Sequence, residues 1–506
     1  MENNKMLFCG LDVGTTGVKA VVFDEKGKPF TEAYRAYAIQ VEADGTRLLR
    51  GREIWEKTRE ALSLASAGAA RETGGQIGAV CADSFGEAFV ALDREGELIC
   101  DPMLFTDRWG EKEYYEAEKK TTALEIAEIC GLPLSPSYSL SKVLYLREQR
   151  PEIYEKIDRI LFIQEFISYM LCGEHGVDYS VACRSMFFDV RNCRWSGELI
   201  GKFGLDWRHY SDPLPMGTAL GTLRKDLAAE LGLSDTVKVV IGGHDQPVNA
   251  IGAGLRESCA VNSMGTSECI TPIIGSMFPP DFTAQKGIPS EPLWEKGKFC
   301  CMAYNPSSGL LIQWFLSAFT DEKEPPFAKF DNSVPSLPTR IMIQPYLMGS
   351  GTPYMESGDR LAITGVDYGT TKFDIYRAVL EGLCLDQELN LAILREQRIP
   401  VTQIIATGGG SKSRAWLQIK ADVLQIPVST LEIKEAGALG CAILCAKAAG
   451  LYGSVEEAAR NMSRVKDTVQ PDTRHKDFYA EKFALYRKLH EHVKEESFFS
   501  AKKPLC

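Results

Sequence analysis

The N-terminal end of the chain alternates short apolar runs with a glycine-rich turn. The apolar run over residues 6–11 predicts a β-strand, and the run over 18–23 predicts a second strand soon after it. Between them, Gly14 and Gly17 allow the backbone to turn tightly. The pattern therefore predicts a strand, a turn and a strand, with Asp12 at the end of the first strand.

This turn has the chemistry of a phosphate site. Exposed backbone amides in such a turn bind anions, and Thr15 and Thr16 add hydroxyl donors. Asp12 is placed to hold Mg²⁺ directly or through water. The alternative is a plain β-hairpin. Neither a Walker A loop nor a dinucleotide-binding turn is indicated, because no Gly-Lys-Ser/Thr follows and the next element is a strand.

The strand-turn-strand pattern occurs a second time near residue 260. A predicted strand over 258–264 leads into Gly265 and Thr266, and an apolar strand follows over 269–274. Such a duplication predicts two similar α/β domains that face each other across a cleft, with residues 1–250 in the first and 251–506 in the second. A third turn, Gly408-Gly409-Gly410-Ser411-Lys412-Ser413, closes a strand and opens a predicted helix over 414–424.

Asp245 is the candidate for a reacting base. A predicted strand over 237–241 runs into two glycines, His244 and Asp245, and a helix is expected over 248–254. Ligands of parallel sheets bind at this end of the strands. Phosphoryl transfer needs a carboxylate that accepts the proton of a positioned hydroxyl. Asp245 could instead only cap the helix, but beside two phosphate-type turns we favour the catalytic role. We expect His244 to pack beside Asp245 or to orient it.

Composition and charge narrow the class of protein. A chain of 506 residues with 45% hydrophobic and 25% charged residues is typical of a soluble protein with two large domains. The net charge of −11 argues against nucleic-acid and anionic-membrane partners. The 15 cysteines are scattered without a Cys-x-x-Cys pair, which indicates reduced core residues. With no signal peptide and no apolar span, we expect a cytoplasmic protein.

Two further segments receive structural predictions. Residues 321–338 are rich in proline and charge and predict a surface loop. Residues 475–496 predict a charged amphipathic helix at the C-terminal end of the second domain.

The chain resembles the FGGY family of carbohydrate kinases, within the actin, Hsp70 and hexokinase-like superfamily. Six segments in the order typical of the family carry the resemblance: 12–19, 242–246, 262–267, 377–382, 408–422 and 435–440. The resemblance implies an α/β fold of two ribonuclease H-like domains, of the actin and hexokinase type, around a central cleft. It places the sugar on residues 1–250 and the nucleotide on 251–506. It also implies a pair of strands over 178–186 beneath the sugar, to which we assign no role.

The resemblance also implies ATP and Mg²⁺ as cofactors. Adenosine would lie near Gly409 and Gly410, and Asp12 and Asp245 would face the metal ion. The residues implied to contact the nucleotide are Gly14, Thr15, Thr16, Lys19, Gly265, Thr266, Gly408, Gly409, Gly410 and Ser413.

Four residues are expected to contact the substrate. Glu87 occupies a position that is His in xylulokinase-like and Glu in glycerol-kinase-like members, and its carboxylate can accept bonds from two neighbouring hydroxyls. The alternative for Glu87 is an exposed loop charge. Phe105-Thr106-Asp107-Arg108-Trp109 resembles the family's Trp-x-Asp-x-Arg segment, in which the Asp binds substrate or stabilises its loop. Gln246 could bind a terminal hydroxyl, and Trp109 could stack on a sugar face or belong to the core.

These predictions combine into one leading function. It is the ATP-dependent phosphorylation of a hydroxyl of a small sugar or polyol, with a ketose such as a pentulose favoured and Asp245 as the base. A glycerol- or tetritol-type polyol kinase stays open, and so, more remotely, does an actin- or Hsp70-like ATPase without a sugar substrate. The expected partner is a small molecule; the oligomeric state is open, with a homodimer as one option.

Overall fold

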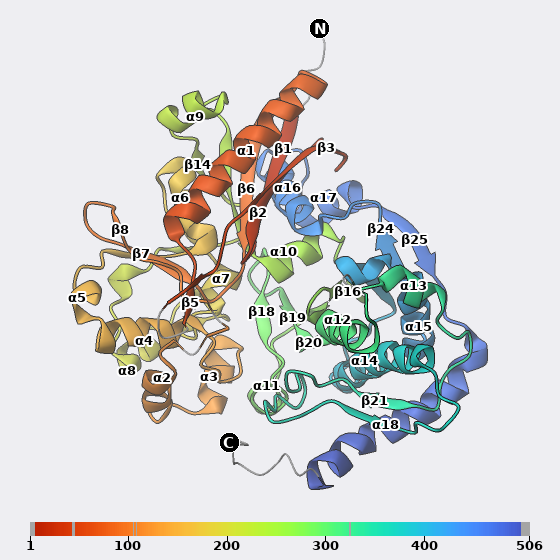
Figure 1. The fold of residues 1–506 in the computed structure, drawn as a ribbon. Coiled ribbons are helices and arrows are strands. Elements are labelled where there is room, and N and C mark those ends of the chain that lie inside the picture. The colour runs from red at the N-terminus through yellow and green to blue at the C-terminus, as the bar shows by residue number, and fades with distance from the viewer. Residues whose placement is uncertain (1–5, 43–45, 105, 108, 323–324, 497–506) are drawn as a thin grey trace.

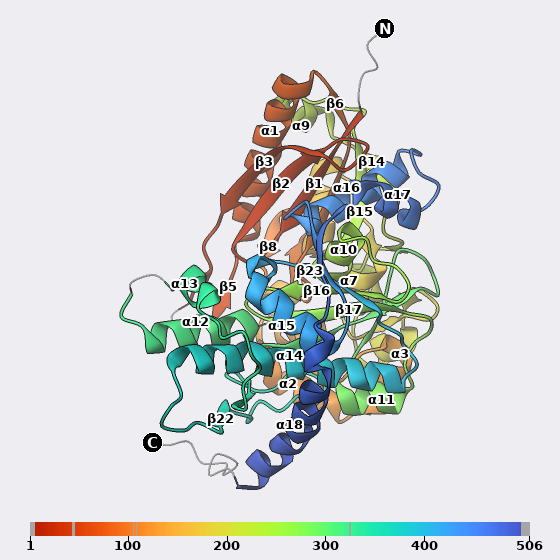
Figure 2. The same ribbon diagram turned by 90° about the vertical axis from the view of Figure 1, so that its right-hand side faces the viewer.

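The computed structural model describes residues 6–42, 46–104, 106–107, 109–322 and 325–496. Two mixed β-sheets with their helices lie side by side, one built from the N-terminal half and one from the C-terminal half (Figure 1). The predicted α/β architecture of two related domains is therefore confirmed. Figure 2, a quarter turn away, shows the first sheet above most of the helices of the second half.

The first sheet has the strand order β14-β15-β6-β1-β2-β3. Its strands are β1 (Met6–Val13), β2 (Gly17–Phe23), β3 (Pro29–Ala36), β6 (Gln76–Ser84), β14 (Ala219–Thr222) and β15 (Lys238–His244). Both predicted N-terminal strands are confirmed, and β1 runs two residues beyond the apolar run. Asp12 therefore lies inside β1, paired in register with Lys19 of β2 and Asp83 of β6.

Helices and a small sheet complete the N-terminal half. Helices α1 and α6 pack against the first sheet, and a three-stranded sheet of order β8-β7-β9 lies beside it. The bounds of these elements are α1 (Gly51–Thr73), α2 (Glu111–Glu118), α3 (Ala123–Cys130), α4 (Ser139–Gln149), α6 (Ile163–Cys172), α7 (Tyr179–Cys183), α8 (Gly197–Phe203), α9 (Lys225–Leu231), β7 (Phe89–Leu92), β8 (Leu98–Cys100) and β9 (Arg159–Phe162).

The second sheet repeats the strand-turn-strand unit, as predicted. It contains β16 (Cys259–Met264), β17 (Glu268–Ile274), β18 (Ser290–Pro292), β19 (Phe299–Cys301), β20 (Ala303–Asn305), β23 (Gln403–Thr407), β24 (Val428–Leu431) and β25 (Val465–Val469). The helices of this half are α11 (Pro280–Lys286), α12 (Ser308–Phe319), α13 (Phe327–Asn332), α14 (Lys372–Glu396), α15 (Arg414–Leu424), α16 (Ala436–Ala448), α17 (Val455–Met462) and α18 (Lys476–Glu496). The predicted helices at 414–424 and 475–496 are thereby confirmed.

Two segment predictions are wrong. Residues 178–186 form a very short strand followed by α7, because the Asp178 side chain accepts hydrogen bonds from the amides of Ser180 and Val181 and so caps a helix. Residues 321–338 contain α13, whose Phe330 is fully buried. The charged residues around α13 had concealed the apolar face that holds this short helix in place.

Helix α10 (Asp245–Gly252) and α16 cross closely between the two halves, and α16 packs on β1 and β6. Glycines permit this approach: a Cβ at Gly252 would lie 1.8 Å from the Ala436 carbonyl oxygen, and one at Gly440 would lie 2.0 Å from that of Val248. The C-terminal half thus supplies a helix to the first sheet.

Gly440→Ala is expected to destabilise the protein, because the new methyl group would overlap the backbone of α10. Overpacking of a close-packed interior costs about 1–3 kcal/mol. Gly201→Ala in α8 is the matched control, since nothing lies within 4 Å of its added Cβ. Thermal melting should show a lower Tm for Gly440→Ala and an unchanged or higher Tm for Gly201→Ala.

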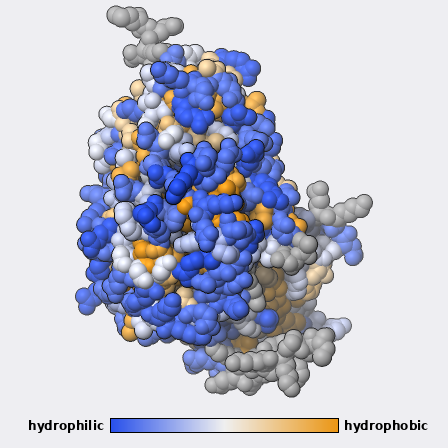
Figure 3. Space-filling model, turned by 90° about the vertical axis from the view of Figure 1, so that its left-hand side faces the viewer, coloured by the Kyte–Doolittle hydropathy of each residue, from blue (hydrophilic) through white to orange (hydrophobic). Residues whose placement is uncertain are grey.

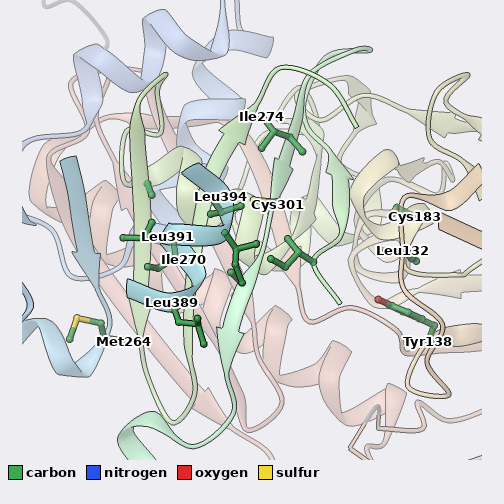
Figure 4. Close-up of a cluster of buried hydrophobic side chains, with 14 of the residues drawn as sticks. Leu132, Tyr138, Cys183, Met264, Ile270, Ile274, Cys301, Leu389, Leu391 and Leu394 are labelled. Carbon is green, nitrogen blue, oxygen red and sulfur yellow. The ribbon is translucent and has the colours of Figure 1, made fainter. Parts of the chain in front are cut away.

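The largest apolar cluster spans both halves. Figure 4 shows Ile270 and Ile274 of β17 and three leucines of α14 in the same cluster as Leu132, Tyr138 and Cys183 of the N-terminal half. The outer face of the N-terminal half is mostly hydrophilic, with apolar atoms in small patches (Figure 3). Among the described residues, no helix is long and apolar enough to span a membrane.

Candidate active site

The first glycine turn, between β1 and β2, is braced by its own backbone and by two tyrosines. The amide of Gly14 donates to the Gly17 carbonyl at 3.0 Å, and the Tyr37 hydroxyl donates to the Gly14 carbonyl. The Tyr34 hydroxyl donates to the Thr16 carbonyl at 3.1 Å. Thr16 is exposed and Thr15 is half-buried. The turn is thus held in shape while its threonines face outward.

Asp12 lies beside a second, fully buried carboxylate. Asp83 is 0% exposed, and neither of its carboxylate oxygens has a hydrogen-bond partner among the described residues. Burial holds the pKa of Asp83 well above its usual range. A Cβ at Gly437, in the first turn of α16, would lie 3.0 Å from Asp83 Oδ2 and 3.4 Å from Asp12 Oδ2. Lys19, predicted to contact phosphate, forms an ion pair of 2.6 Å with Glu435.

The charge balance at this point suits a divalent cation. Burial, with the charge of Asp245 adding to it, raises the pKa of Asp12 to about 6, although Lys19 opposes the rise. Carboxylate oxygens are the ligand type that Mg²⁺ prefers, and those of Asp83 have no hydrogen-bond partner among the described residues. Asp12 therefore fits its predicted role. Sequence reasoning missed Asp83, although its place at the end of a buried strand next to β1 was a usable signal.

The second hairpin turn, between β16 and β17, is tied to the start of α12. The amides of Gly309 and Leu310 donate to the carbonyls of Gly265 and Thr266, each at 3.1 Å. Glu268, the first residue of β17, is fully buried and forms an ion pair with Lys420 of α15. Gly265 and Thr266 themselves are exposed. The predicted phosphate turn is therefore held by α12 and by the buried ion pair, while Gly265 and Thr266 stay exposed.

The third glycine turn lies against this hairpin. Gly408 has φ +79°, and a Cβ there would lie 2.8 Å from the Met264 carbonyl oxygen. A Cβ at Gly410 would lie 2.5 Å from the Trp416 ring. Ser413 accepts a hydrogen bond of 3.1 Å from the Trp416 amide and so caps α15. Glycine is required here because the turn touches the end of β16.

A cavity of about 520 Å³ lies between the second hairpin, α12, α13 and the third turn. Its apolar walls and exposed glycine backbone fit a purine base with its ribose. It is lined by Met264, Gly265, Thr266, Gly309, Ile312, Gln313, Phe327, Ala328, Asp331, Tyr376, Gly409, Gly410, Lys412, Ser413 and Trp416. Five of the predicted nucleotide residues line it. The α13 residues Phe327, Ala328 and Asp331 were missed, because that segment was expected to be a loop.

Asp245 begins α10 next to a buried histidine. His244 Nε2 lies 3.2 Å from Asp245 Oδ1, and His244 Nδ1 lies 2.7 Å from Oε1 of Glu291 in β18. The Asp245 side chain remains 38% exposed. The partial burial of Asp245 raises its pKa, while the nearby His244 opposes the rise. Burial lowers the pKa of His244, but the Glu291 and Asp245 carboxylates outweigh it and raise that pKa to about 9.

Glu87 is not an exposed loop charge; it is 4% exposed and paired with Arg184. Arg184 Nε donates to Glu87 Oε1 at 2.6 Å, and Arg184 Nη1 lies 3.6 Å from Glu291 Oε2. Burial alone would raise the pKa of Glu87, but Arg184 and His244 outweigh it and hold that pKa below its usual range. Sequence reasoning missed Arg184 and Glu291, since no motif marks either residue.

The remaining predicted substrate residues lie in two separate parts of the structure. Gln246 adjoins Asp245, and its buried Oε1 has no hydrogen-bond partner among the described residues. Asp107 instead forms an ion pair of 2.7 Å with Arg47, and the Trp109 indole N–H donates to the Arg47 carbonyl at 3.2 Å. Trp109 lines a separate cavity with Tyr145. Phe105 and Arg108 lie outside the described residues.

Two α/β domains that each present a hairpin turn, with a glycine-rich turn and a cavity on the second, define a fold of the actin and hexokinase type. Sequence models of the FGGY family of carbohydrate kinases match the chain over residues 7–252 for the N-terminal domain and 260–449 for the C-terminal domain. The chain belongs to this family and is a carbohydrate kinase.

Curated relatives agree with this assignment, and a solved structure agrees with the fold. The chain is 25% identical to the xylulose kinase of Bacillus subtilis (strain 168) over 491 residues, which cover 96% of this chain and 97% of that protein. It is 26% identical to the autoinducer-2 kinase of Escherichia coli (strain K12), with 95% and 93% covered. The structure of a gluconate kinase from Lactobacillus acidophilus superposes with a TM-score of 0.88 at 21% identity, with 97% and 99% covered.

Proposed function

We propose that the protein transfers the γ-phosphate of Mg-ATP to a hydroxyl of a small ketose, with a pentulose as the first candidate. The observation that carries this proposal is the position of Asp245. It stands partly exposed at the start of α10, next to Gln246 and within electrostatic reach of Asp12. This arrangement supports the proposal, because Asp245 would accept a proton close to Gln246, which can bind a hydroxyl, and within reach of the turn proposed to bind phosphate.

Asp245 would accept the proton of the attacking hydroxyl, or orient that hydroxyl for in-line transfer. Thr15 and Thr266, with the amides of their turns, would donate hydrogen bonds to the phosphates as negative charge builds on the leaving oxygen. Asp12 and Asp83 would hold Mg²⁺, with Asp245 facing it. The metal ion would neutralise charge on the β- and γ-phosphates.

The polar groups near Asp245 favour an uncharged polyhydroxy compound. Gln246 Oε1 can accept a hydrogen bond from a substrate hydroxyl, and Glu87 can accept a further one. The Arg184 guanidinium is already neutralised by Glu87 and lies near Glu291, so it is not available to pair with the carboxylate of a sugar acid. We therefore favour a ketose over gluconate. Asp107 and Trp109 would contact the substrate only if their segment moved away from Arg47.

ADP release with Mg-ATP and a panel of ketopentoses, ketohexoses, deoxyketoses, tetruloses, glycerol, other polyols and gluconate tests the proposal. We expect at least one ketose to stimulate ADP release well above the sugar-free rate. Stimulation by glycerol or a tetritol alone would establish the polyol kinase instead. ADP release that no compound stimulates would contradict the proposal. We place the reaction in the cytoplasm, in keeping with the free thiols of the described cysteines.

A further inference from the structure

We propose that His244 is a positioning residue that holds the Asp245 carboxylate for catalysis and is itself oriented by Glu291. The inference rests on the proposed role of Asp245 as the base. Its basis is a chain of contacts: Glu291 Oε1 to His244 Nδ1 at 2.7 Å, then His244 Nε2 to Asp245 Oδ1 at 3.2 Å. Both ring nitrogens of His244 therefore contact a carboxylate oxygen.

The imidazole is held too firmly to act as a mobile acid or base. His244 is 6% exposed, and its amide donates to Ser180 Oγ at 3.0 Å, which fixes the backbone just before α10. A Cβ at Gly86 would lie 3.2 Å from His244 Cδ2, so the ring is also packed against the Gly86 backbone. A fixed imidazole fixes the carboxylate that it contacts. Because Asp245 is partly exposed, this contact limits which rotamers its side chain can adopt.

Glu291 comes from the other half of the sequence. It lies in β18, an edge strand of the second sheet that packs on α7 of the N-terminal half. Its side chain is fully buried, with Oε2 lying 3.6 Å from Arg184 Nη1. A buried carboxylate at this point needs a reason, because burial of a charge is costly unless partners compensate it. His244 and Arg184 supply that compensation, so Glu291 is held in place and can orient His244.

The expected effect is a loss of turnover without a loss of binding. Misplacing a reacting group by about 1 Å can cost about 10²-fold in rate. We expect His244→Asn, whose amide can still reach Glu291 but not Asp245, to lower kcat by about 10- to 100-fold. The KM for sugar and for ATP, and the Tm, should stay close to those of the parent protein. Glu291→Gln keeps the hydrogen-bond acceptor and should lose at most a few-fold in kcat.

Two further variants separate positioning from general structure. Glu291→Ala removes the contact and should lower kcat as His244→Asn does, and the His244→Asn/Glu291→Ala double variant should lose no more than either single one, because both act through one chain. Ser290→Ala is the matched control on the same strand: it removes the hydrogen bond to the Phe278 amide and leaves the His244 contacts intact. Its kcat should be unchanged.

The outcomes distinguish this inference from the proposed base. If Asp245→Asn is inactive while His244→Asn and Glu291→Ala keep full kcat, the positioning role is overturned and the base stands. If Ser290→Ala loses kcat as Glu291→Ala does, or if the effects of His244→Asn and Glu291→Ala multiply, the loss is structural and the inference is also overturned. If Asp245→Asn itself keeps its activity, Asp245 is not the base, and the proposed function is contradicted before the positioning role is tested. Should Glu291→Ala not fold, His244→Asn and Glu291→Gln still give the decisive comparison.

Discussion

Asp245→Asn should lower kcat of the sugar-dependent reaction by about 10³-fold or more, because a correctly placed general base contributes about 10²–10⁴-fold. The amide keeps the shape of the side chain and its place beside His244 but cannot accept the proton. ATP affinity should change little, since the nucleotide cavity is lined by residues of the C-terminal half. Steady-state kinetics, with ATP binding measured separately, check both parts.

The matched control is Asp206→Asn, which makes the same chemical change at a carboxylate paired with Arg208 on the surface. This variant should keep the parent kcat and KM. An Asp245→Asn or Asp245→Ala variant with more than about a tenth of the parent activity would show that Asp245 is not the base.

Lys420→Met is expected to destabilise the protein by about 3–5 kcal/mol, because it leaves a buried carboxylate without its counter-charge. Lys420 and Glu268 are both fully buried, and Ser308 Oγ donates to the other Glu268 oxygen at 2.9 Å. The pair joins the second hairpin to α15, so ATP binding should weaken as well. Chemical unfolding and ATP titration measure the two effects.

A second substitution and a surface control sharpen this test. Glu268→Gln added to Lys420→Met removes the uncompensated charge and should restore part of the stability. Lys329→Met breaks an exposed ion pair with Glu322, and such pairs contribute about 0–1 kcal/mol. Equal losses for Lys420→Met and Lys329→Met would mean that the buried pair does not anchor the hairpin.

Much of the fold could be predicted from the sequence because local patterns determine it. The apolar runs on both sides of Gly14 and Gly265 form the two hairpins, and the helix over 414–424 begins at its capping Ser413. In each case the residues that form the signal lie within a few positions of the element that they predict. At 178–186 the resemblance was misleading, because Asp178 caps a helix where a pair of strands was expected.

The site could be predicted only in part, because its contacts join distant segments. Arg184 and Glu291 meet Glu87 through folding alone, and each would look like a surface charge in its own segment. Asp83 becomes significant only once β6 lies beside β1. Asp107 was assigned by resemblance and Trp109 by its aromatic ring, and the structure places both beside Arg47. Long-range ion pairs of this kind leave no trace in a single sequence.

The most direct test of the central claim follows the phosphate. Purified protein is incubated with Mg-ATP and the most stimulating sugar, and ADP, inorganic phosphate and sugar phosphate are quantified together. A carbohydrate kinase with its base at Asp245 predicts one sugar monophosphate for each ADP, and neither product above background with Asp245→Asn. ADP released with inorganic phosphate and no sugar phosphate would contradict the account and identify an ATPase.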